Sequence, residues 1–306
     1  MEEIHQKIIS TYDGLPLEMT ILKPDCLPKV KGIFQICHGM AEHQKRYLSF
    51  MQFLVKNGYI CVIHDHRGHG DSIKFAEDLG YFYDTTGKAI IEDAYQVTKY
   101  MKEHFPNLPI YLFGHSMGSM VVRNYIKSYD DEINKLIVCG PPCENKTAGI
   151  GAILAKWIIK VKGAHYRSPI LQHLALSGYE RSFKEESINS CIVSQKEVVK
   201  EYDADEKCGF VFTTNGFLNL FLLMKNTYSK QNWQRNNLNL PILFIAGEED
   251  PVIGNSFKFQ KAQDFLKQIG YKNVRGKLYV GKRHEILNED IKQQVYEDIL
   301  HFIENP

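Results

Sequence analysis

The sequence predicts an α/β protein with a mostly parallel central sheet, helices on both faces of the sheet and a helical cap insertion. Short, unbroken apolar runs alternate with longer segments of helical periodicity, as expected for strands that are buried on both faces. This alternation stops after Pro141-Pro142 and resumes at Pro241. The chain of 306 residues, with 44% hydrophobic and 24% charged residues, is long enough to bury a sizeable core.

Each strand and helix of this scheme has a local signal. The expected strands are short apolar runs, and the expected helices mostly end just before Gly or Pro, which are common stop signals. The first 24 residues contain Asp13-Gly14 between two β-patterned stretches and predict an antiparallel hairpin at the sheet edge. The strands are expected at 33–37, 59–64, 110–114, 136–139, 242–246 and 277–280. The helices are expected at 47–57, 88–104, 117–129, 256–269 and 289–303.

The interruption of the alternation predicts the domain organisation. Residues 1–143 form the first part of the core, 144–236 form a helical cap and 237–306 complete the core. Open α/β sheets bind their ligands at the carboxyl ends of the strands. We therefore expect the cap to lie over that edge.

Composition excludes several classes of protein. The 37 Lys and Arg residues against 36 Asp and Glu give a net charge of +1, so nucleic acid is not an expected partner. The N-terminus lacks the pattern of a signal peptide, no apolar stretch is long enough to span a membrane, and we expect a cytoplasmic protein. Seven cysteines favour reduced thiols over a disulfide framework, with Cys37, Cys61 and Cys139 as core residues.

A nucleophile candidate follows the expected strand 110–114. The segment Gly114-His115-Ser116-Met117-Gly118 has the G-x-S-x-G spacing, with a strand before it and a helix after it. The glycines allow strand and helix to approach, so that the turn exposes the Ser116 hydroxyl. It also directs the Met117 amide toward a developing oxyanion. The alternative is that Ser116 only caps the helix.

A serine nucleophile needs a base and an acid that orients it, in the chain order Ser, acid, His. Asp250 follows the expected strand 242–246 and is our candidate for the acid, since Pro251 fixes the next turn. Glu248 and Glu249 are the alternatives for this role.

The base and the second oxyanion donor are assigned by position. Of the twelve histidines, His284 and His301 follow Asp250, and His301 falls within the expected last helix. His284 is therefore the candidate base, with an ordinary surface histidine as the alternative. The second amide of an oxyanion hole normally comes from the loop after the first buried strand. There Gly39 permits a sharp reversal, and the amide of Met40 is the expected donor.

Another segment is rich in metal-ligand residue types. His64-Asp65-His66-Arg67-Gly68-His69-Gly70-Asp71-Ser72 offers three histidines and two aspartates, which are good metal ligands. Two glycines directly after a strand also indicate a tight loop with its own hydrogen-bonding frame. We favour the loop, expect no metal and interpret His38 as a residue that braces its own turn.

These motifs together resemble the α/β-hydrolase superfamily, and within it the monoacylglycerol lipase and lysophospholipase group, which is similar to the serine aminopeptidases. The resemblance covers about residues 5–143 and 236–306 and not the cap. It implies Ser116 as nucleophile, Asp250 as acid and His284 as base, with Ser119 as a departure from the second glycine of many relatives. The motifs are His38-Gly39-Met40-Ala41-Glu42-His43, residues 65–72, Gly114-His115-Ser116-Met117-Gly118, Gly247-Glu248-Glu249-Asp250-Pro251 and His284-Glu285.

The cap is expected to shape the acyl site in this family. Residues 150–161 predict a helix with a broad apolar face and lysines among its polar positions, and 217–224 is nearly all apolar. Trp157, Phe217 and Phe221 are the candidate substrate-binding residues. Transient contact of the cap with a membrane surface is a further hypothesis. The alternative is that these helices simply pack on the core.

The function predicted from the sequence is a serine hydrolase of carboxylic esters, acting on monoacylglycerol or lysophospholipid substrates through an acyl-enzyme without a cofactor. An aminopeptidase or amidase is the second hypothesis, with Glu185-Glu186 or residues 203–206 as an acidic pocket for the substrate amine. A non-catalytic receptor for a small ligand is the third. The sequence does not predict the oligomeric state.

Overall fold

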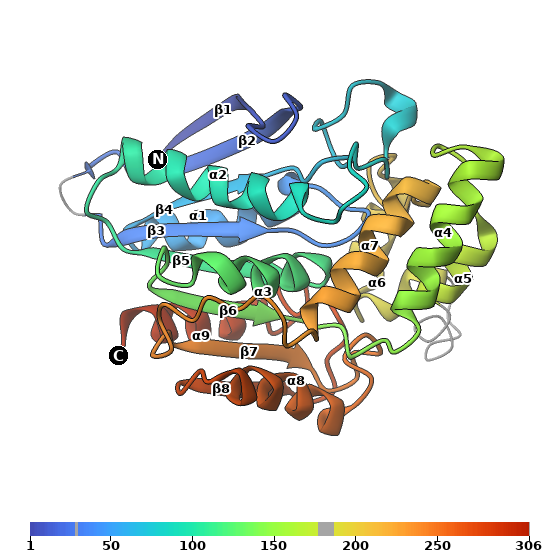
Figure 1. Ribbon diagram of the computed structural model, residues 1–306. Coiled ribbons are helices and arrows are strands. Elements are labelled where there is room, and N and C mark those ends of the chain that lie inside the picture. Colours follow the sequence, from blue (N-terminus) through green and yellow to red (C-terminus); the bar gives the residue numbers. More distant parts are fainter. Residues whose placement is uncertain (28–29, 177–186, 306) are drawn as a thin grey trace.

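A single mixed sheet organises the molecule (Figure 1). The computed structural model describes residues 1–27, 30–176 and 187–305. The described strands form an eight-stranded sheet in the order β1-β2-β4-β3-β5-β6-β7-β8. They are β1 (Glu2–Ile9), β2 (Pro16–Lys23), β3 (Gly32–Cys37), β4 (Tyr59–His64), β5 (Ile110–His115), β6 (Lys135–Cys139), β7 (Ile242–Gly247) and β8 (Val274–Tyr279).

Strand direction places the loops of the site at one edge. Strands β4, β3, β5, β6, β7 and β8 are parallel, and the β1–β2 hairpin adds to β4 through an antiparallel pairing. The predicted parallel sheet and its edge hairpin are both confirmed. The carboxyl ends of β3, β5, β6 and β7 therefore lie side by side, although the strands are distant in sequence.

Helices cover both faces of the sheet, as predicted. Helices α1 (Leu48–Lys56) and α9 (Lys292–Glu304) pack on one face. Helices α2 (Ala89–His104), α3 (Met117–Tyr129) and α8 (Ser256–Ile269) pack on the other. The cysteines of β3, β4 and β6 are fully buried in these two cores, as expected. Burial raises the pKa of the Cys37 thiol to about 12.

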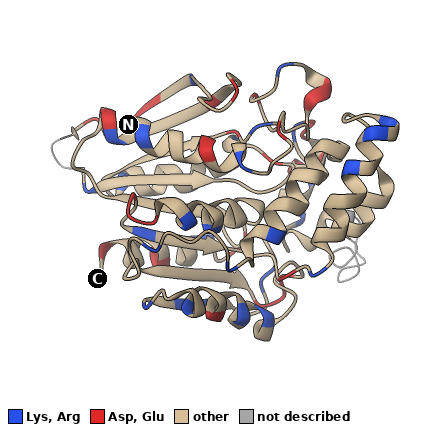
Figure 2. Cartoon of the chain, in the orientation of Figure 1, with Lys and Arg blue, Asp and Glu red and all other residues tan. Residues whose placement is uncertain are grey.

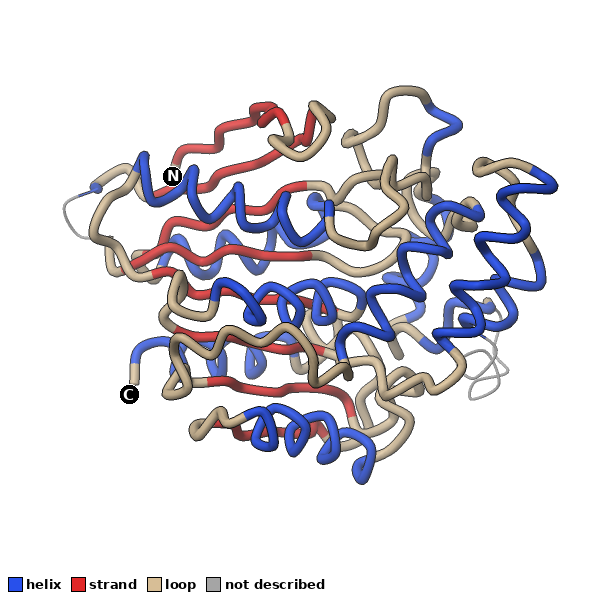
Figure 3. Tube along the Cα trace, viewed as in Figure 1, coloured by secondary structure: helices blue, strands red, loops and turns tan. Residues whose placement is uncertain are grey.

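Between β6 and β7, the described part of the chain forms helices and loops and contains no strand. Its helices are α4 (Ala148–Lys162), α5 (Pro169–Leu176), α6 (Lys196–Ala204) and α7 (Thr214–Thr227). Figure 3 shows them beyond the edge toward which the parallel strands run. This arrangement supports the proposed division into a core (1–143 and 237–306) and a cap (144–236). Among the described helices, none combines the length and apolar character that crossing a membrane requires.

One strand differs from its prediction. Strand β8 spans Val274–Tyr279 instead of 277–280. As the edge strand of the sheet it exposes Arg275 and Gly276. The start of β8 therefore lacks the unbroken apolar run by which the buried strands are found.

Candidate active site

Ser116 occupies a strained turn between β5 and α3. Its φ of 53° and ψ of −115° are rarely adopted by a residue with a side chain. The turn is tied to its neighbours, because the Ser116 amide donates to the Cys139 carbonyl at 2.9 Å. The Ser119 hydroxyl donates to the Ser116 carbonyl at 2.6 Å. The strain is thus held by β6 and α3, and Ser116 lines a cavity between core and cap.

The two glycines of the motif serve different contacts. A Cβ at Gly114 would lie 2.3 Å from the Gly118 carbonyl oxygen, which confirms that strand and helix approach closely there. A Cβ at Gly118 would lie 2.1 Å from the carbonyl oxygen of Cys37 at the end of β3. Gly118 therefore brings α3 against the neighbouring strand. Ser119, the expected departure from the family pattern, fits because its hydroxyl donates to the Ser116 carbonyl within the same turn.

Asp250 and His284 meet below the same cavity. His284 Nδ1 lies 2.8 Å from Asp250 Oδ2, and the other carboxylate oxygen accepts the Val252 amide at 2.8 Å. Both side chains are buried. Glu248 and Glu249 are exposed on the preceding turn. The geometry therefore supports Asp250 over either glutamate as the orienting acid.

The surroundings of His284 favour its protonated form. Burial by itself lowers the pKa of the ring, but the Asp250 carboxylate and its hydrogen bond, with Glu285 and Glu42 nearby, outweigh burial and raise the pKa above 6.5. Gly140, with a φ of 53°, leaves room for the ring, since a Cβ there would lie 2.8 Å from His284 Cε1. Sequence reasoning did not single out Gly140.

The loop after β3 is fixed by hydrogen bonds between the His38 ring and backbone groups. We refer to residues 38–43 as the oxyanion loop. His38 Nδ1 lies 2.8 Å from the Gly39 carbonyl oxygen, and the His66 amide donates to His38 Nε2 at 2.9 Å. A carbonyl only accepts and an amide only donates, so the His38 proton sits on Nδ1. The ring braces its own turn, as interpreted from the sequence.

This loop and α3 each contribute one residue to the cavity wall whose amide has no acceptor among the described residues. The Gly39 amide donates to Glu42 Oε1 at 2.5 Å and is therefore occupied. In the hydrogen bonding of the described residues, neither the Met40 nor the Met117 amide has a protein acceptor. Both residues line the cavity with Ser116. This arrangement supports Met40 and Met117 as the pair of oxyanion donors.

A buried ion network joins the oxyanion loop to the histidine loop. Arg46 bonds Glu42 Oε2 at 2.7 Å and holds both oxygens of Glu285, at 2.6 and 2.7 Å. Burial opposes ionisation of Glu42, but His115 and Arg46 outweigh it and hold its pKa well below the usual range. Sequence reasoning missed Arg46. The available signal was its spacing of four residues from Glu42.

The cap closes the cavity with apolar side chains. Phe217, Leu220 and Met224 of α7 line it together with Leu176 of α5. The other two candidate substrate residues lie elsewhere. Phe221 packs against Gly151 of α4, where a Cβ would lie 2.8 Å from the ring, and Trp157 is 62% exposed.

The histidine-rich segment after β4 forms a hydrogen-bonded loop. Asp65 accepts the amides of Gln44 and Asp71 at 2.8 and 2.9 Å, and the Ser72 hydroxyl donates to the Asp65 carbonyl at 2.7 Å. Burial lowers the pKa of His64 to about 3. Asp65 and Ser72 thus frame the loop as we favoured. The His64 and His66 rings do not take part in this frame, because neither ring nitrogen of either residue has a hydrogen-bond partner among the described residues.

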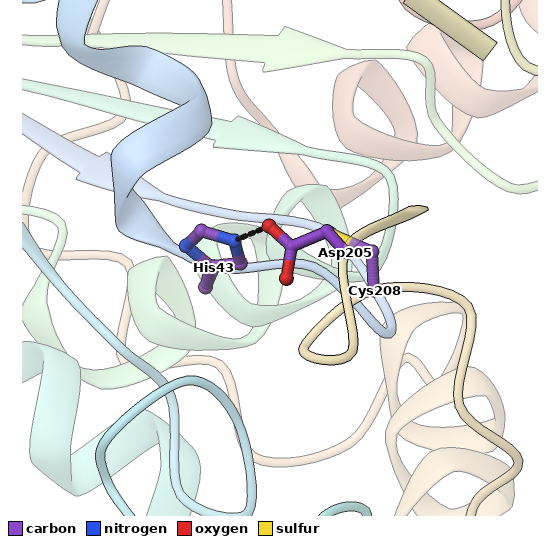
Figure 4. A group of neighbouring side chains, drawn as sticks. All are labelled: His43, Asp205 and Cys208. Atoms are coloured by element: carbon purple, nitrogen blue, oxygen red, sulfur yellow. Dashed lines mark hydrogen bonds and ion pairs between the residues drawn. The ribbon is translucent and has the colours of Figure 1, made fainter. Parts of the chain in front are cut away.

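Within the described ranges, side chains with metal-ligand spacing occur at the junction of oxyanion loop and cap. His43, Asp205 and Cys208 (Figure 4) place ligand atoms within 4.8 Å of one another. His43 Nε2 already bonds Asp205 Oδ2 at 2.8 Å. The Lys207 amide also donates to Asp205 Oδ1 at 2.8 Å, so both carboxylate oxygens of Asp205 are engaged within the protein. The group is therefore better described as a contact between loop and cap than as a metal site.

The parallel sheet, the strained serine turn and the cap together define an α/β-hydrolase fold. The model of the family described as serine aminopeptidase, S33, matches residues 28–291, and the chain belongs to this family.

Similar proteins agree with this assignment. The chain is 25% identical to a monoacylglycerol lipase of Mycolicibacterium smegmatis, over 95% of this chain and 93% of the relative. It is 21% identical to a probable lysophospholipase L2 of Haemophilus influenzae, over 90% of this chain and 84% of the relative. A crystal structure of a thermostable carboxyl esterase from Bacillus coagulans matches with a TM-score of 0.90 and 28% identity, covering 99% of this chain and 98% of that chain. The protein is thus an α/β hydrolase of the lipase or esterase type.

Proposed function

We propose that the protein hydrolyses monoacylglycerols and similar long-chain monoesters through an acyl-enzyme on Ser116. The observation that carries this proposal is that Ser116 and His284 line one apolar cavity, with His284 bonded to Asp250 at 2.8 Å behind it. The chain order serine, acid, histidine is that of an α/β-hydrolase triad.

The chemistry follows from these positions. The Ser116 oxygen attacks the ester carbonyl carbon while His284 Nε2 takes its proton. The carbonyl oxygen becomes an oxyanion that accepts the Met40 and Met117 amides. The imidazolium then gives its proton to the departing alcohol, which leaves an acyl group on Ser116. Water repeats the sequence, with His284 as base, and releases the acid. Asp250 keeps the Nδ1 proton in place throughout.

The charges of the cavity favour an ester over an aminoacyl substrate. An aminopeptidase needs a free carboxylate for the substrate amine. Of the described lining residues, Glu42 and Glu285 carry carboxylates, and Arg46 bonds both. In 203–206, Asp203 bonds Asn189 and Asp205 bonds His43, whereas Glu206 is exposed and does not line the cavity. The other predicted acidic pair, 185–186, lies outside the described residues.

The same lining favours a neutral head group. Among the described residues of the cavity wall there is no Lys or Arg to neutralise a phosphate. An apolar wall with few polar groups suits an acyl chain that ends in an uncharged alcohol. We therefore favour monoacylglycerols over lysophospholipids. The similarity to the mycobacterial monoacylglycerol lipase over nearly the whole chain supports this choice.

A substrate panel tests the proposal. We expect 1-monoacylglycerols of eight to eighteen carbons to be hydrolysed faster than lysophosphatidylcholine or an aminoacyl anilide. Ser116→Ala should lower kcat by roughly 10⁴-fold or more. Ser256→Ala, an exposed serine at the start of α8, is the matched control. Unchanged ester turnover in Ser116→Ala, or a preference for the anilide, would refute the proposal.

We also propose that the outer face of α4 contacts a lipid surface during the reaction. Ile150, Ile153, Trp157 and Val161 recur at helical spacing and are 61 to 72% exposed. Neither α4 nor α5 contains an acidic residue, and Figure 2 shows basic residues on α4. A basic amphipathic face suits the membrane interface.

Vesicle sedimentation tests this contact. Ile153→Glu should weaken binding to anionic vesicles and leave turnover of a soluble ester unchanged. The control is Val280→Glu, which alters a similarly exposed apolar residue that lies outside the cap, directly after β8. Equal binding of both variants would contradict the proposed contact.

A further inference from the structure

We propose that three residues of the cap, Tyr202, Asp205 and Gly209, which we call the cap clasp, position the oxyanion loop and so take part in the chemical step. This inference rests on the proposed function, because it concerns the Met40 amide as an oxyanion donor. It assigns positioning roles to Tyr202, Asp205 and Gly209, which come from the cap and not from the hydrolase core.

The first contact is at the residue after Met40. The Ala41 carbonyl oxygen accepts the Tyr202 hydroxyl at 2.9 Å and the Gly209 amide at 2.9 Å. Ala41 has a φ of 51°, in the region that residues with a Cβ rarely adopt. Such a conformation persists when its surroundings hold it. Both donors to this carbonyl come from the cap clasp.

The second contact is at the end of the oxyanion loop. His43 is buried, and its Nε2 lies 2.8 Å from Asp205 Oδ2 (Figure 4). Asp205 is itself held in a turn, because its Oδ1 accepts the Lys207 amide and its carbonyl accepts the Cys208 amide, both at 2.8 Å. The cap clasp therefore grips the loop at two points, Ala41 and His43.

These contacts complete the restraint of one peptide. The core holds the carbonyl of the Gly39–Met40 peptide through His38, and it holds the preceding peptide through Glu42, which accepts the Gly39 amide. Those bonds fix the Gly39–Met40 peptide from the strand side. Rotation about Ala41 would still turn it relative to the rest of the loop, and the cap clasp opposes that rotation. Any shift of the clasp therefore changes the direction in which the Met40 amide points.

The hydroxyl of Tyr202 can be separated from its ring. The ring packs over the Arg46 guanidinium at 4.8 Å and borders the cavity. Tyr202→Phe keeps those contacts and removes the bond to Ala41. Asp205→Asn keeps an acceptor for the Lys207 amide and removes the charge opposite His43. Glu206→Gln makes the matching charge change at an exposed neighbour and is the control.

The experiment compares two kinds of ligand in the full-length protein. The Ser116 hydroxyl adds to the carbonyl of a long-chain trifluoromethyl ketone, and the product places an oxyanion at the Met40 and Met117 amides. A long-chain alcohol fills the acyl site without forming an oxyanion. We expect Tyr202→Phe and Asp205→Asn each to lower kcat and ketone affinity about tenfold, with KM and alcohol affinity within about twofold of the parent. Glu206→Gln should match the parent in every assay, and melting temperatures show whether each variant is folded.

Two results would overturn the inference while leaving the proposed function intact. One is that both clasp variants have the same kcat and the same ketone affinity as Glu206→Gln. The other is an equal loss of ketone and alcohol affinity, which would make the clasp part of the acyl site alone. Ester hydrolysis that persists in Ser116→Ala would instead refute the proposed function, and this inference with it.

Discussion

Gly118 is the residue at which packing and catalysis are most tightly linked, so Gly118→Ala is a sharp perturbation. A Cβ at this position would lie 2.1 Å from the Cys37 carbonyl oxygen and 2.5 Å from that of His38. An ordinary contact between carbon and a carbonyl oxygen is about 3.3 Å. The start of α3 must therefore move by roughly 1.2 Å, the difference between the contact of about 3.3 Å and the 2.1 Å available.

This displacement acts on both parts of the site. Ser116 and the Met117 amide move with α3, whereas the oxyanion loop stays attached to β3. A misplacement of about 1 Å costs roughly 10² in rate, and overpacking a well-filled contact costs about 1–3 kcal/mol of unfolding free energy. We expect kcat on a short p-nitrophenyl ester to fall about 10²-fold and the melting temperature to fall as well.

Gly149→Ala provides the matched control for this prediction. Gly149 lies in α4, and a Cβ there meets nothing within 4 Å. The same substitution should therefore leave kcat unchanged and raise the unfolding free energy by about 0.5–1 kcal/mol, because alanine favours the helix. A Gly118→Ala protein with the parent's kcat and melting temperature would refute the claim that this backbone contact sets the position of Ser116.

Three further predictions follow from the charges. Because the pKa of His284 is raised above 6.5, the proposed base becomes protonated as the pH falls through a value above 6.5. A pH profile of kcat/KM should therefore show a loss of activity on this acidic limb. Asp250→Asn should lower kcat by roughly 10⁴-fold and move that limb to lower pH, since burial then dominates; an unmoved limb would contradict the assigned pair. Arg67→Met should cost about 3–5 kcal/mol in urea unfolding, because it leaves the buried carboxylate of Asp93 without its partner, and a loss below 1 kcal/mol would contradict this account.

The buried strands could be predicted because burial on both faces leaves a direct mark on the sequence. The run from Tyr59 to Ile63 in β4 is apolar throughout. The apolar run of β5 leads into the G-x-S-x-G motif, whose glycine spacing has a steric cause. The edge strand β8 leaves no such mark, because Arg275 and Gly276 are exposed and only the first and last residues of the strand are buried. Its bounds were set by pairing with β7, which no local pattern records.

The loops that carry the three candidate triad residues could be placed for a related reason. Ser116, Asp250 and His284 each lie within four residues of the end of a predicted strand, so sheet topology alone brings their loops to one edge. The supporting residues have no such rule. Tyr202 bonds Ala41, which is 161 positions away in the sequence. Arg46 bonds Glu285, which is 239 positions away. Contacts of this kind depend on the tertiary packing of the cap against the loops, and no local sequence pattern predicts that packing.

The network around Glu42 explains why the site tolerates so much buried charge. One oxygen of Glu42 accepts the Gly39 amide and the Tyr47 hydroxyl, and the other accepts Arg46. A half-satisfied network of this kind would be costly, and here both oxygens are paired. Arg46 is shared between Glu42 and Glu285, so one cation faces two carboxylates. The remaining negative charge raises the pKa of His284, in addition to the larger effect of Asp250. The charges that hold the oxyanion loop thus also favour the protonated form of His284, which is the form that the proposed mechanism requires after attack by Ser116.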